Sequence, residues 1–227
     1  MRFYNMTRHR KFMLVIVTWL ISAAGCGVIG VLTTPTSSEK FFKAEYDIAE
    51  HANGKILVVV EQENWGMAEA NFGLYLTEYF NEALRQYAKV KERYLVGYSD
   101  LLRFQASCAG FSQLSPARKG ALYGADKVLL VVVEGQQLSE QADSGYYEGY
   151  LNTRSFVFDV NSGLIVWPGS AEGKRISVGI ESERGADDTA VRRLARSTAY
   201  CVVRYLYNCP KDKFRNSDER IAEIGYW

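Results

Sequence analysis

The sequence predicts an α/β fold: a single layered domain with a mixed sheet of about five strands, an early βα crossover, an antiparallel meander and a long C-terminal covering helix. Two β-branched apolar runs, residues 56–60 and 127–134, are typical of strands buried on both faces. Apolar side chains recur at helical spacing over residues 69–88 and again over 187–208. Alternation over residues 150–160 indicates a strand that returns through a hairpin.

The first crossover unit joins the strand at residues 56–60 to the helix at 69–88. Phe72, Leu76 and Phe80 fall on one side of that helix, and charged residues fall off it. The right-handed crossover rule places this apolar side against the sheet. Residues 90–98 then alternate loosely, which predicts a second strand.

Two short helices are predicted before the next buried strand. Ser99 and Asp100 can cap the first of them. Ser115 followed by Pro116 predicts an N-cap and the first position of the second helix. The third strand, residues 127–134, follows directly.

The second half of the domain reads as a meander and a covering helix. Residues 161–163 (Asn-Ser-Gly) form a turn between the strand at 150–160 and its partner at 164–167. A long helix over residues 187–208, capped by one of its first two aspartates, is expected to cover the sheet until Pro210 ends it.

The N-terminal segment has the three parts of a bacterial lipoprotein export signal. Residues 12–21 form an apolar stretch of ten residues, and small residues then precede Cys26. Ala23 stands where a lipobox most often has leucine. The basic residues before the apolar stretch are Arg2, Arg8, Arg10 and Lys11. Cys26 is therefore the predicted lipidation site and the first residue of the mature protein.

An uncleaved membrane anchor is the alternative interpretation of this segment. Apolar character continues to residue 32, so residues 12–32 could form a transmembrane helix of about 20 residues. The basic flank would then remain cytoplasmic. Cys26 lies where cleavage chemistry needs it, which favours the lipoprotein.

These segments set the expected organisation of the chain. Residues 1–25 are the predicted signal peptide, 26–50 a lipidated tether rich in Ser and Thr, 51–210 the α/β domain and 211–227 a charged C-terminal tail. Gly27 follows the cysteine instead of the aspartate that signals inner-membrane retention. The expected location is the cell envelope, at the outer membrane facing the periplasm, with the inner membrane as the alternative for an uncleaved helix.

Composition argues against nucleic acid as a partner. The 27 basic residues less the four in the predicted signal leave 23, against 26 acidic residues, so the mature chain has a net charge of about −3. Cys108, Cys201 and Cys209 remain besides Cys26. One disulfide involving Cys108 and three free, buried thiols are both compatible with this spacing.

Three landmarks in this order resemble one lipoprotein superfamily. They are the GKILVVV strand with its long helix, the LYGADKVLLVVV segment at 122–133, and the FVFDVNSGLIVW hairpin at 156–167. Together, behind a lipobox, they resemble the superfamily of the curli secretion lipoprotein, the lipoprotein activators of penicillin-binding proteins and the N-terminal domain of TolB. The resemblance covers roughly residues 55–208 and implies a non-catalytic module. Asn161-Ser162 departs from the acidic-Thr pair usual at this turn.

The sequence shows little catalytic equipment. His51 is the one histidine of the predicted domain, and nucleophile-elbow, Walker and dinucleotide-binding motifs are absent from the sequence. No CxxC pair indicates a metal, so neither metal nor cofactor is expected. Carboxylates that could perform acid–base work are Asp126, Glu134, Glu140, Asp143 and Glu148, although such residues are more often solvated or paired.

Two aromatic segments are candidate partner-binding surfaces. Tyrosine adds contact area with few rotors and a polar tip, which favours it at interfaces. The alternative is that these rings cover the sheet or plug a loop over the core. The candidate residues are Trp65, Met67, Tyr146, Tyr147 and Tyr150.

The sequence therefore predicts a membrane-anchored envelope lipoprotein, not an enzyme, that binds or scaffolds an envelope protein in cell-wall or secretion machinery. The alternative function is a carboxylate-dependent hydrolase acting on an envelope polymer, which requires two facing carboxylates with raised pKa. Assembly into a homo-oligomer is a further expectation, drawn from the resemblance.

Overall fold

The computed structural model describes residues 40–52, 54–62, 70–108, 110–142, 144–184 and 187–220. The chain divides into two units, Met1–Lys40 and Phe41–Trp227, and every element below belongs to the second. Cys26, Trp65 and Met67 lie outside the described residues.

A six-stranded mixed sheet confirms the predicted α/β fold class. Its strands are β2 (Lys55–Gln62), β3 (Ala125–Glu140), β4 (Tyr146–Asp159), β5 (Ile165–Trp167), β6 (Lys174–Arg184) and β8 (Glu219–Arg220). They lie in the order β2-β3-β4-β6-β8, and β5 pairs with the end of β4. Strands β2 and β3 are parallel, and the other neighbouring strands are antiparallel.

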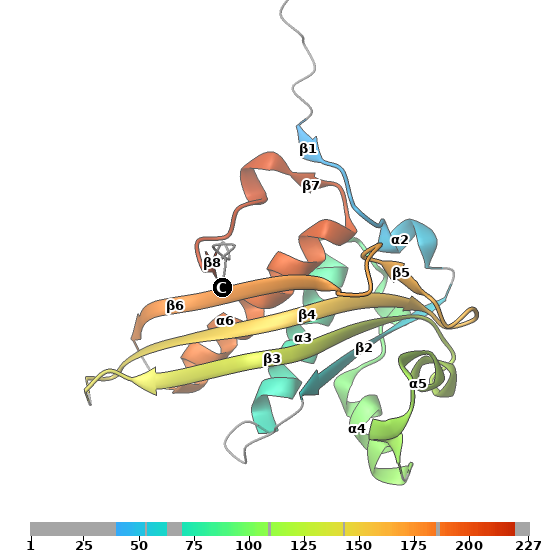
Figure 1. Ribbon diagram of the computed structural model, residues 1–227, viewed down its shortest axis with the longest axis horizontal. Coiled ribbons are helices and arrows are strands. Elements are labelled where there is room, and N and C mark those ends of the chain that lie inside the picture. The colour runs from blue at the N-terminus through green and yellow to red at the C-terminus, as the bar shows by residue number, and fades with distance from the viewer. Residues whose placement is uncertain are drawn as a thin grey trace, which may run out of the picture. The chain divides into compact units, whose positions relative to one another are not determined.

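Helices cover the two faces of this sheet to different extents (Figure 1). Helices α3 (Ala70–Gln86) and α6 (Asp187–Val203) pack side by side on one face. Helices α4 (Tyr98–Ser107) and α5 (Pro116–Leu122) lie on the other face, next to β2 and β3. All four helices predicted from the sequence are therefore confirmed, as α3, α4, α5 and α6.

The face under α3 and α6 forms the larger core. Leu129 of β3 and Leu151 of β4 are fully buried there. Phe80 of α3 and Leu194 of α6 pack onto them, as the predicted apolar sides of these helices require. Full burial of one such side chain stabilises the fold by about 1.5–3 kcal/mol.

The intervening strand residues point to the opposite face and form a smaller core. Val128, Leu130 and Phe156 are buried there with Leu101 of α4 and Phe111. Because α4 and α5 are short, this second layer covers only part of the face. Ser115 caps α5 by accepting a hydrogen bond from the Arg118 backbone N–H at 3.4 Å, as predicted.

The predicted strand at residues 90–98 is wrong. These residues form a single 3-10 turn, η2 (Glu92–Tyr94), and one isolated bridge between Leu95 and Ile56. Val90 packs in the larger core and Val96 in the smaller one. The apolar residues of this segment therefore alternate because they contact two different cores, not because they form a pleated strand. The predicted cap of α4 is also wrong, because the helix starts after Gly97 without a side-chain cap.

The sheet has six strands where about five were predicted, because the strand at 90–98 is lost and β6 and β8, which carried no prediction, are added. Ile176, Val178 and Ile180 of β6 alternate and are buried, but polar and glycine residues separate them. Strands β3 and β4 are also longer than predicted, and pair from Lys127 to Glu140. The long β3–β4 hairpin thus extends well past the shorter β2.

The segment after α6 folds back onto the domain, although it was predicted as a charged tail. Asp218 is buried and accepts hydrogen bonds from Arg193 at 2.6 and 3.0 Å and from Ser197 at 2.7 Å. Burial would raise the pKa of Asp218, but these hydrogen bonds outweigh burial and lower it. Buried Arg204 pairs with Glu219 of β8 in the same way.

Of the two cysteine alternatives, the disulfide is not formed. Cys108, Cys201 and Cys209 are unbridged, with the latter two buried and Cys108 half-buried. Burial raises the pKa of the Cys201 thiol to about 12. Within the described residues, none of the helices is both long and apolar enough to span a membrane.

A two-stranded ribbon stands apart from the main sheet. Strand β1 (Phe41–Phe42) pairs antiparallel with β7 (Cys209–Pro210), and both lie at one end of the domain (Figure 1). Between β1 and β2 the chain forms the short helix α2 (Ile48–His51), and after β7 it forms the 3-10 turn η5 (Lys211–Lys213).

Candidate functional site

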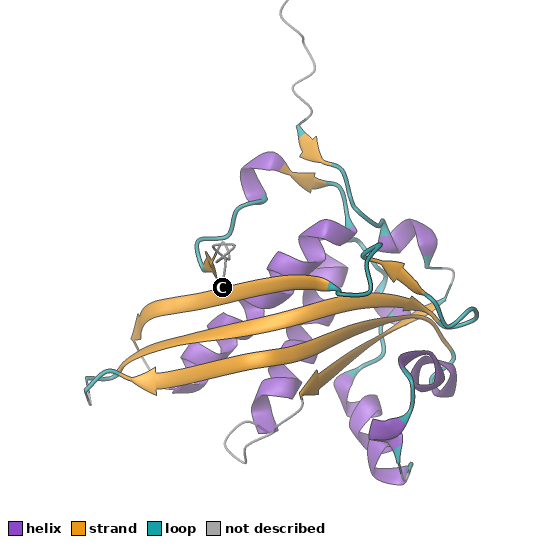
Figure 2. Cartoon of the chain, in the orientation of Figure 1, coloured by secondary structure: helices purple, strands orange, loops and turns teal. Residues whose placement is uncertain are grey.

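One part of the sheet has no helix over it. The face that α4 and α5 cover next to β2 continues across β3, β4 and β6, where no described helix lies on it (Figure 2). We call this surface the open sheet face. By register and alternation it presents Glu134, Gln137, Tyr150, Asn152, Arg154, Arg175 and Ser177.

Polar contacts organise the open sheet face. Glu134, at a bulge in β3, lies 3.1 Å from Arg154 and 3.9 Å from Arg175 in ion pairs. Ser177 donates a hydrogen bond to Asn152 at 2.7 Å. Because Glu134 and Arg175 are partly or largely exposed, these contacts position the side chains more than they stabilise the fold.

Tyr150 lies at the centre of this face between two glycines. Its ring is 3.7 Å from the position that a Cβ on Gly135 would occupy. Gly179 pairs with Tyr150 on β6, and a Cβ there would lie 1.9 Å from the Arg220 Nε. The missing side chain at Gly179 thus makes room for the Arg220 guanidinium. Tyrosine and arginine are the residues enriched at binding hot spots.

The structure separates the three predicted tyrosines. Tyr146 and Tyr150 point to the open sheet face, and Tyr146 is 38% exposed. Tyr147 points to the other face and packs against the larger core. The predicted cluster is therefore split. The sequence did not single out Arg154, Arg175 and Arg220, because they lie on three separate strands.

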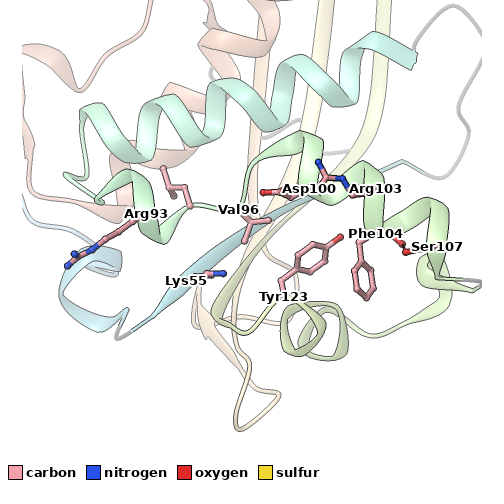
Figure 3. Close-up of a pocket in the computed structure, with 9 residues that line it drawn as sticks. Lys55, Arg93, Val96, Asp100, Arg103, Phe104, Ser107 and Tyr123 are labelled. Atoms are coloured by element: carbon pink, nitrogen blue, oxygen red, sulfur yellow. Dashed lines mark hydrogen bonds and ion pairs between the residues drawn. The ribbon is translucent and has the colours of Figure 1, made fainter.

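A second candidate is a pocket of about 510 Å³ between the start of β2, α4 and α5 (Figure 3). Tyr123 and Phe104 lie close together in it, with ring centroids 5.0 Å apart, and Lys55 and Arg103 also line it. Tyr123 donates to the Leu101 carbonyl at 3.1 Å, and burial raises its pKa to about 12. Tyr123 is therefore a hydrogen-bonded neutral phenol at neutral pH and not a general base.

A larger cavity of about 800 Å³ lies at the end of β2. It borders Lys119, whose ammonium is buried, pairs with Glu61 and donates to the Ser112 carbonyl at 3.3 Å. This nitrogen also lies 5.5 Å above the Phe111 ring. With its charge fully compensated, Lys119 ties α5 to β2 instead of facing a substrate.

The candidate acid–base carboxylates serve structural contacts. Glu134 pairs with arginine, and Glu140 accepts from the Gly145 N–H at 2.8 Å in the hairpin turn. Asp126 and Asp159 flank the Lys127 ammonium at 2.9 and 3.0 Å. Asp143 lies outside the described residues.

The pKa shifts do not favour acid catalysis. Hydrogen bonds from the Ser162 backbone N–H and from Lys127 lower the pKa of Asp159 to about 2. The pKa of Asp188, which is hydrogen-bonded to Tyr75 and Arg192, is also lowered. A general acid in a hydrolase would instead need a raised pKa.

In the part of the chain that the structure describes, neither His51 nor a cluster of metal ligands supplies a catalytic group. His51 lies at the end of α2, where its Nδ1 is 2.7 Å from the Asp47 carbonyl and its ring stacks on Tyr46. Across the described ranges no three His, Cys, Asp or Glu side chains gather as a metal site.

Comparison with known proteins yields structural likeness only. No protein-family model and no curated protein matches the sequence. Solved structures similar to the chain include lipoprotein GNA1162 from Neisseria meningitidis, at 15% identity and a TM-score of 0.42 over 66% of this chain and 98% of that chain. The PelC dodecamer from Paraburkholderia phytofirmans is similar at 16% identity and a TM-score of 0.41, over 73% of this chain and 90% of its own. The LpoB C-terminal domain from Salmonella enterica has 16% identity and a TM-score of 0.30, over 59% and 84%. Likeness at this level assigns neither a family nor a role to the chain.

Proposed function

We propose that the chain is an envelope lipoprotein, lipidated at Cys26, that binds an envelope protein without catalysing a reaction. The lipobox pattern supports the anchor, and the small-residue run before Cys26 is the feature that export processing needs. We place the protein at the outer membrane facing the periplasm, with an uncleaved helix in the inner membrane as the alternative anchor.

The observation that carries the binding role is the open sheet face. On this face Tyr150 and Arg154 project from β4 and Arg175 projects from the neighbouring β6, and the β4 backbone is held on both sides by ladder hydrogen bonds to β3 and β6. A rigid surface of this kind loses little conformational entropy when a partner docks. The described carboxylates, by contrast, are engaged in ion pairs and turn contacts, which supports a binding module over the hydrolase alternative.

Site-specific photo-crosslinking in cells tests this role. A photoreactive phenylalanine analogue replaces Tyr150 or Gln137 in the full chain, and the matched control replaces Leu122, which is 44% exposed on α5. We expect a discrete adduct with an envelope protein from both open-face positions and none from the control. Absence of an adduct from both positions, or equal adducts from all three, would refute binding through this face.

The expected homo-oligomer stays a prediction. Mass measurement of the acylated protein in detergent tests it, and a monomeric mass would exclude assembly without a partner. The cell-wall and secretion machineries are the processes in which we would first seek the crosslinked protein.

A further inference from the structure

We propose that the end of the domain next to the tether docks directly on a bilayer that contains anionic phospholipid. The docking surface, here the aromatic–basic platform, consists of β1 and the residues beside it. Its members are Phe41, Phe42, Lys43, Lys211, Lys213 and Arg215. The inference rests on the proposed function, because an anchored chain is what keeps this surface near lipid.

Two adjacent phenylalanines are exposed at this end. Phe41 is 50% and Phe42 43% exposed, although a strand of this composition normally buries at least one face. The β1–β7 ribbon is separate from the main sheet (Figure 1), so successive rings on its two faces both reach the surface. Adjacent exposed aromatic rings are a feature of surfaces that enter the headgroup region of a membrane.

The rings are held in place by the fold. Phe42 packs on Phe214 with ring centroids 4.3 Å apart, and the buried Arg204 guanidinium lies 4.3 Å from the same Phe214 ring. The Ala44 backbone N–H donates to the Asn208 side chain at 3.1 Å, which fixes the ribbon to the end of the last helical turn. The platform is thus a structured surface of the domain and pre-organised for docking.

The local charge is opposite to that of the rest of the chain. Residues 41–43 and 211–215 contain four basic residues and one acid, Asp212, whereas the chain after residue 25 carries a net charge of about −3. The basic side chains are exposed, and the Lys211 ammonium lies 5.6 Å from the Phe42 ring. Each basic residue close to an anionic bilayer strengthens attachment by about fivefold.

The length of chain before the platform agrees with this placement. Phe41 lies 15 residues after Cys26, which limits their separation to about 50 Å even if the chain is fully extended. The platform is therefore the part of the described domain nearest in sequence to the lipid. It lies on a different side of the domain from the open sheet face (Figure 1), so membrane and protein partner can be bound together.

Photo-crosslinking in proteoliposomes tests the proposal on the full lipidated protein. The photoreactive analogue replaces Phe41, and the control replaces Leu102, which is 45% exposed on α4 at the opposite end of the view in Figure 1. The vesicles are phosphatidylcholine with or without about one third phosphatidylglycerol. We expect a phospholipid adduct at residue 41 at least about tenfold above the control, and a yield that falls severalfold in neutral vesicles or at high salt.

Charge reversal separates docking from simple proximity to the anchor. Lys211→Glu with Lys213→Glu should lower the adduct yield at residue 41 about tenfold or more, whereas Lys91→Glu with Arg118→Glu, both at exposed positions, should leave it unchanged. Equal yields at residues 41 and 102, or a protein adduct in place of the lipid adduct, would overturn the proposal. So would equal effects of the two charge reversals.

Whether the purified chain carries a lipid distinguishes a failure of the platform proposal from a failure of the proposed function. The mass of the intact protein shows whether Cys26 carries a lipid. If it does not, the proposed anchor is refuted, and cosedimentation of the same chain with the two kinds of vesicle then tests the platform. Stronger binding to anionic vesicles would support the platform, and equal binding to both would overturn it.

Discussion

Two neighbouring residues of β4 show how differently the faces of the sheet are built. Leu151 points to α3 and α6 and is fully buried, whereas Asn152 points to the open sheet face and accepts a hydrogen bond from Ser177. The covered face gains stability from apolar area removed from water. The open face holds partly exposed ion pairs, which each stabilise by about 0–1 kcal/mol. The fold therefore depends little on the open face, and its residues remain available to a partner.

The largest effect should come from truncating the covered face. Leu151→Ala leaves a cavity in the larger core and should lower the free energy of unfolding by about 2–5 kcal/mol. Its matched control, Asn152→Ala on the open face, should cost about 1 kcal/mol or less. Urea unfolding followed by circular dichroism measures both, and equal costs would contradict the difference between the faces.

The buried arginine of the covered layer should come next. Arg204→Met removes the partner of Glu219 and leaves the Phe214 carbonyl without its donor, at a cost of about 3 kcal/mol. Arg175→Met removes an ion pair from the open face, where the side chain is 66% exposed, and should change stability by less than about 1 kcal/mol. A smaller loss for Arg204→Met than for Arg175→Met would show that burial does not govern these pairs.

Two glycines compare the covered and the open part of the second face. Gly120 of α5 packs against the covered part, and a Cβ there would lie 2.5 and 2.6 Å from methyl groups of Val160 and Val128, so Gly120→Ala should cost about 1–3 kcal/mol through overpacking. On the open part, a Cβ on Gly179 meets the flexible end of Arg220, which can move aside. Thermal unfolding should therefore show a larger loss for Gly120→Ala than for Gly179→Ala.

A pH-dependent contribution should come from the Asp159 carboxylate at the end of β4. Its folded-state pKa is lowered to about 2 by hydrogen bonds from Ser162 and Lys127. Its stabilisation is therefore fully present above the unfolded pKa of about 4 and is lost as the pH falls from there towards 2. Asp159→Asn should lower stability at pH 7 by on the order of 1 kcal/mol and flatten the acid limb of the stability curve. An unchanged acid limb would contradict the assigned contacts.

Tyr150→Ala should have the smallest effect on stability but a large effect on the binding of the partner protein. The ring is half-buried on the open face, so the free energy of unfolding should change by about 1 kcal/mol or less. Truncation of a hot-spot tyrosine should weaken partner binding by about 30-fold, equivalent to about 2 kcal/mol. If this variant loses crosslinking from Gln137 but keeps its melting temperature, the open face serves binding and not stability. Unchanged crosslinking would show that Tyr150 is not part of the interface.

The elements predicted well are those whose own residues carry a strong pattern. The β-branched run in β2 and the apolar sides of α3 and α6 identified these elements from local spacing, and the Asn-Ser-Gly turn identified the β4–β5 hairpin. The Ser115–Pro116 start of α5 was equally local. In each case the information lies within about one or two turns of chain, which the sequence displays directly.

The sequence alone thus determined the fold class and the order of most helices and strands, because these depend on patterns that each segment carries itself, and the lipobox at Cys26 stays a prediction. Tertiary structure decided that residues 90–98 form no strand and that β6 and β8 do, because pairing with a distant strand supplies the backbone hydrogen bonds that weak local patterns leave open. It also decided the surfaces. Tyr150 and Arg175 lie on one face, Arg220 lies beside Gly179, and Phe41 pairs with Pro210, only because strands remote in sequence become neighbours in the fold.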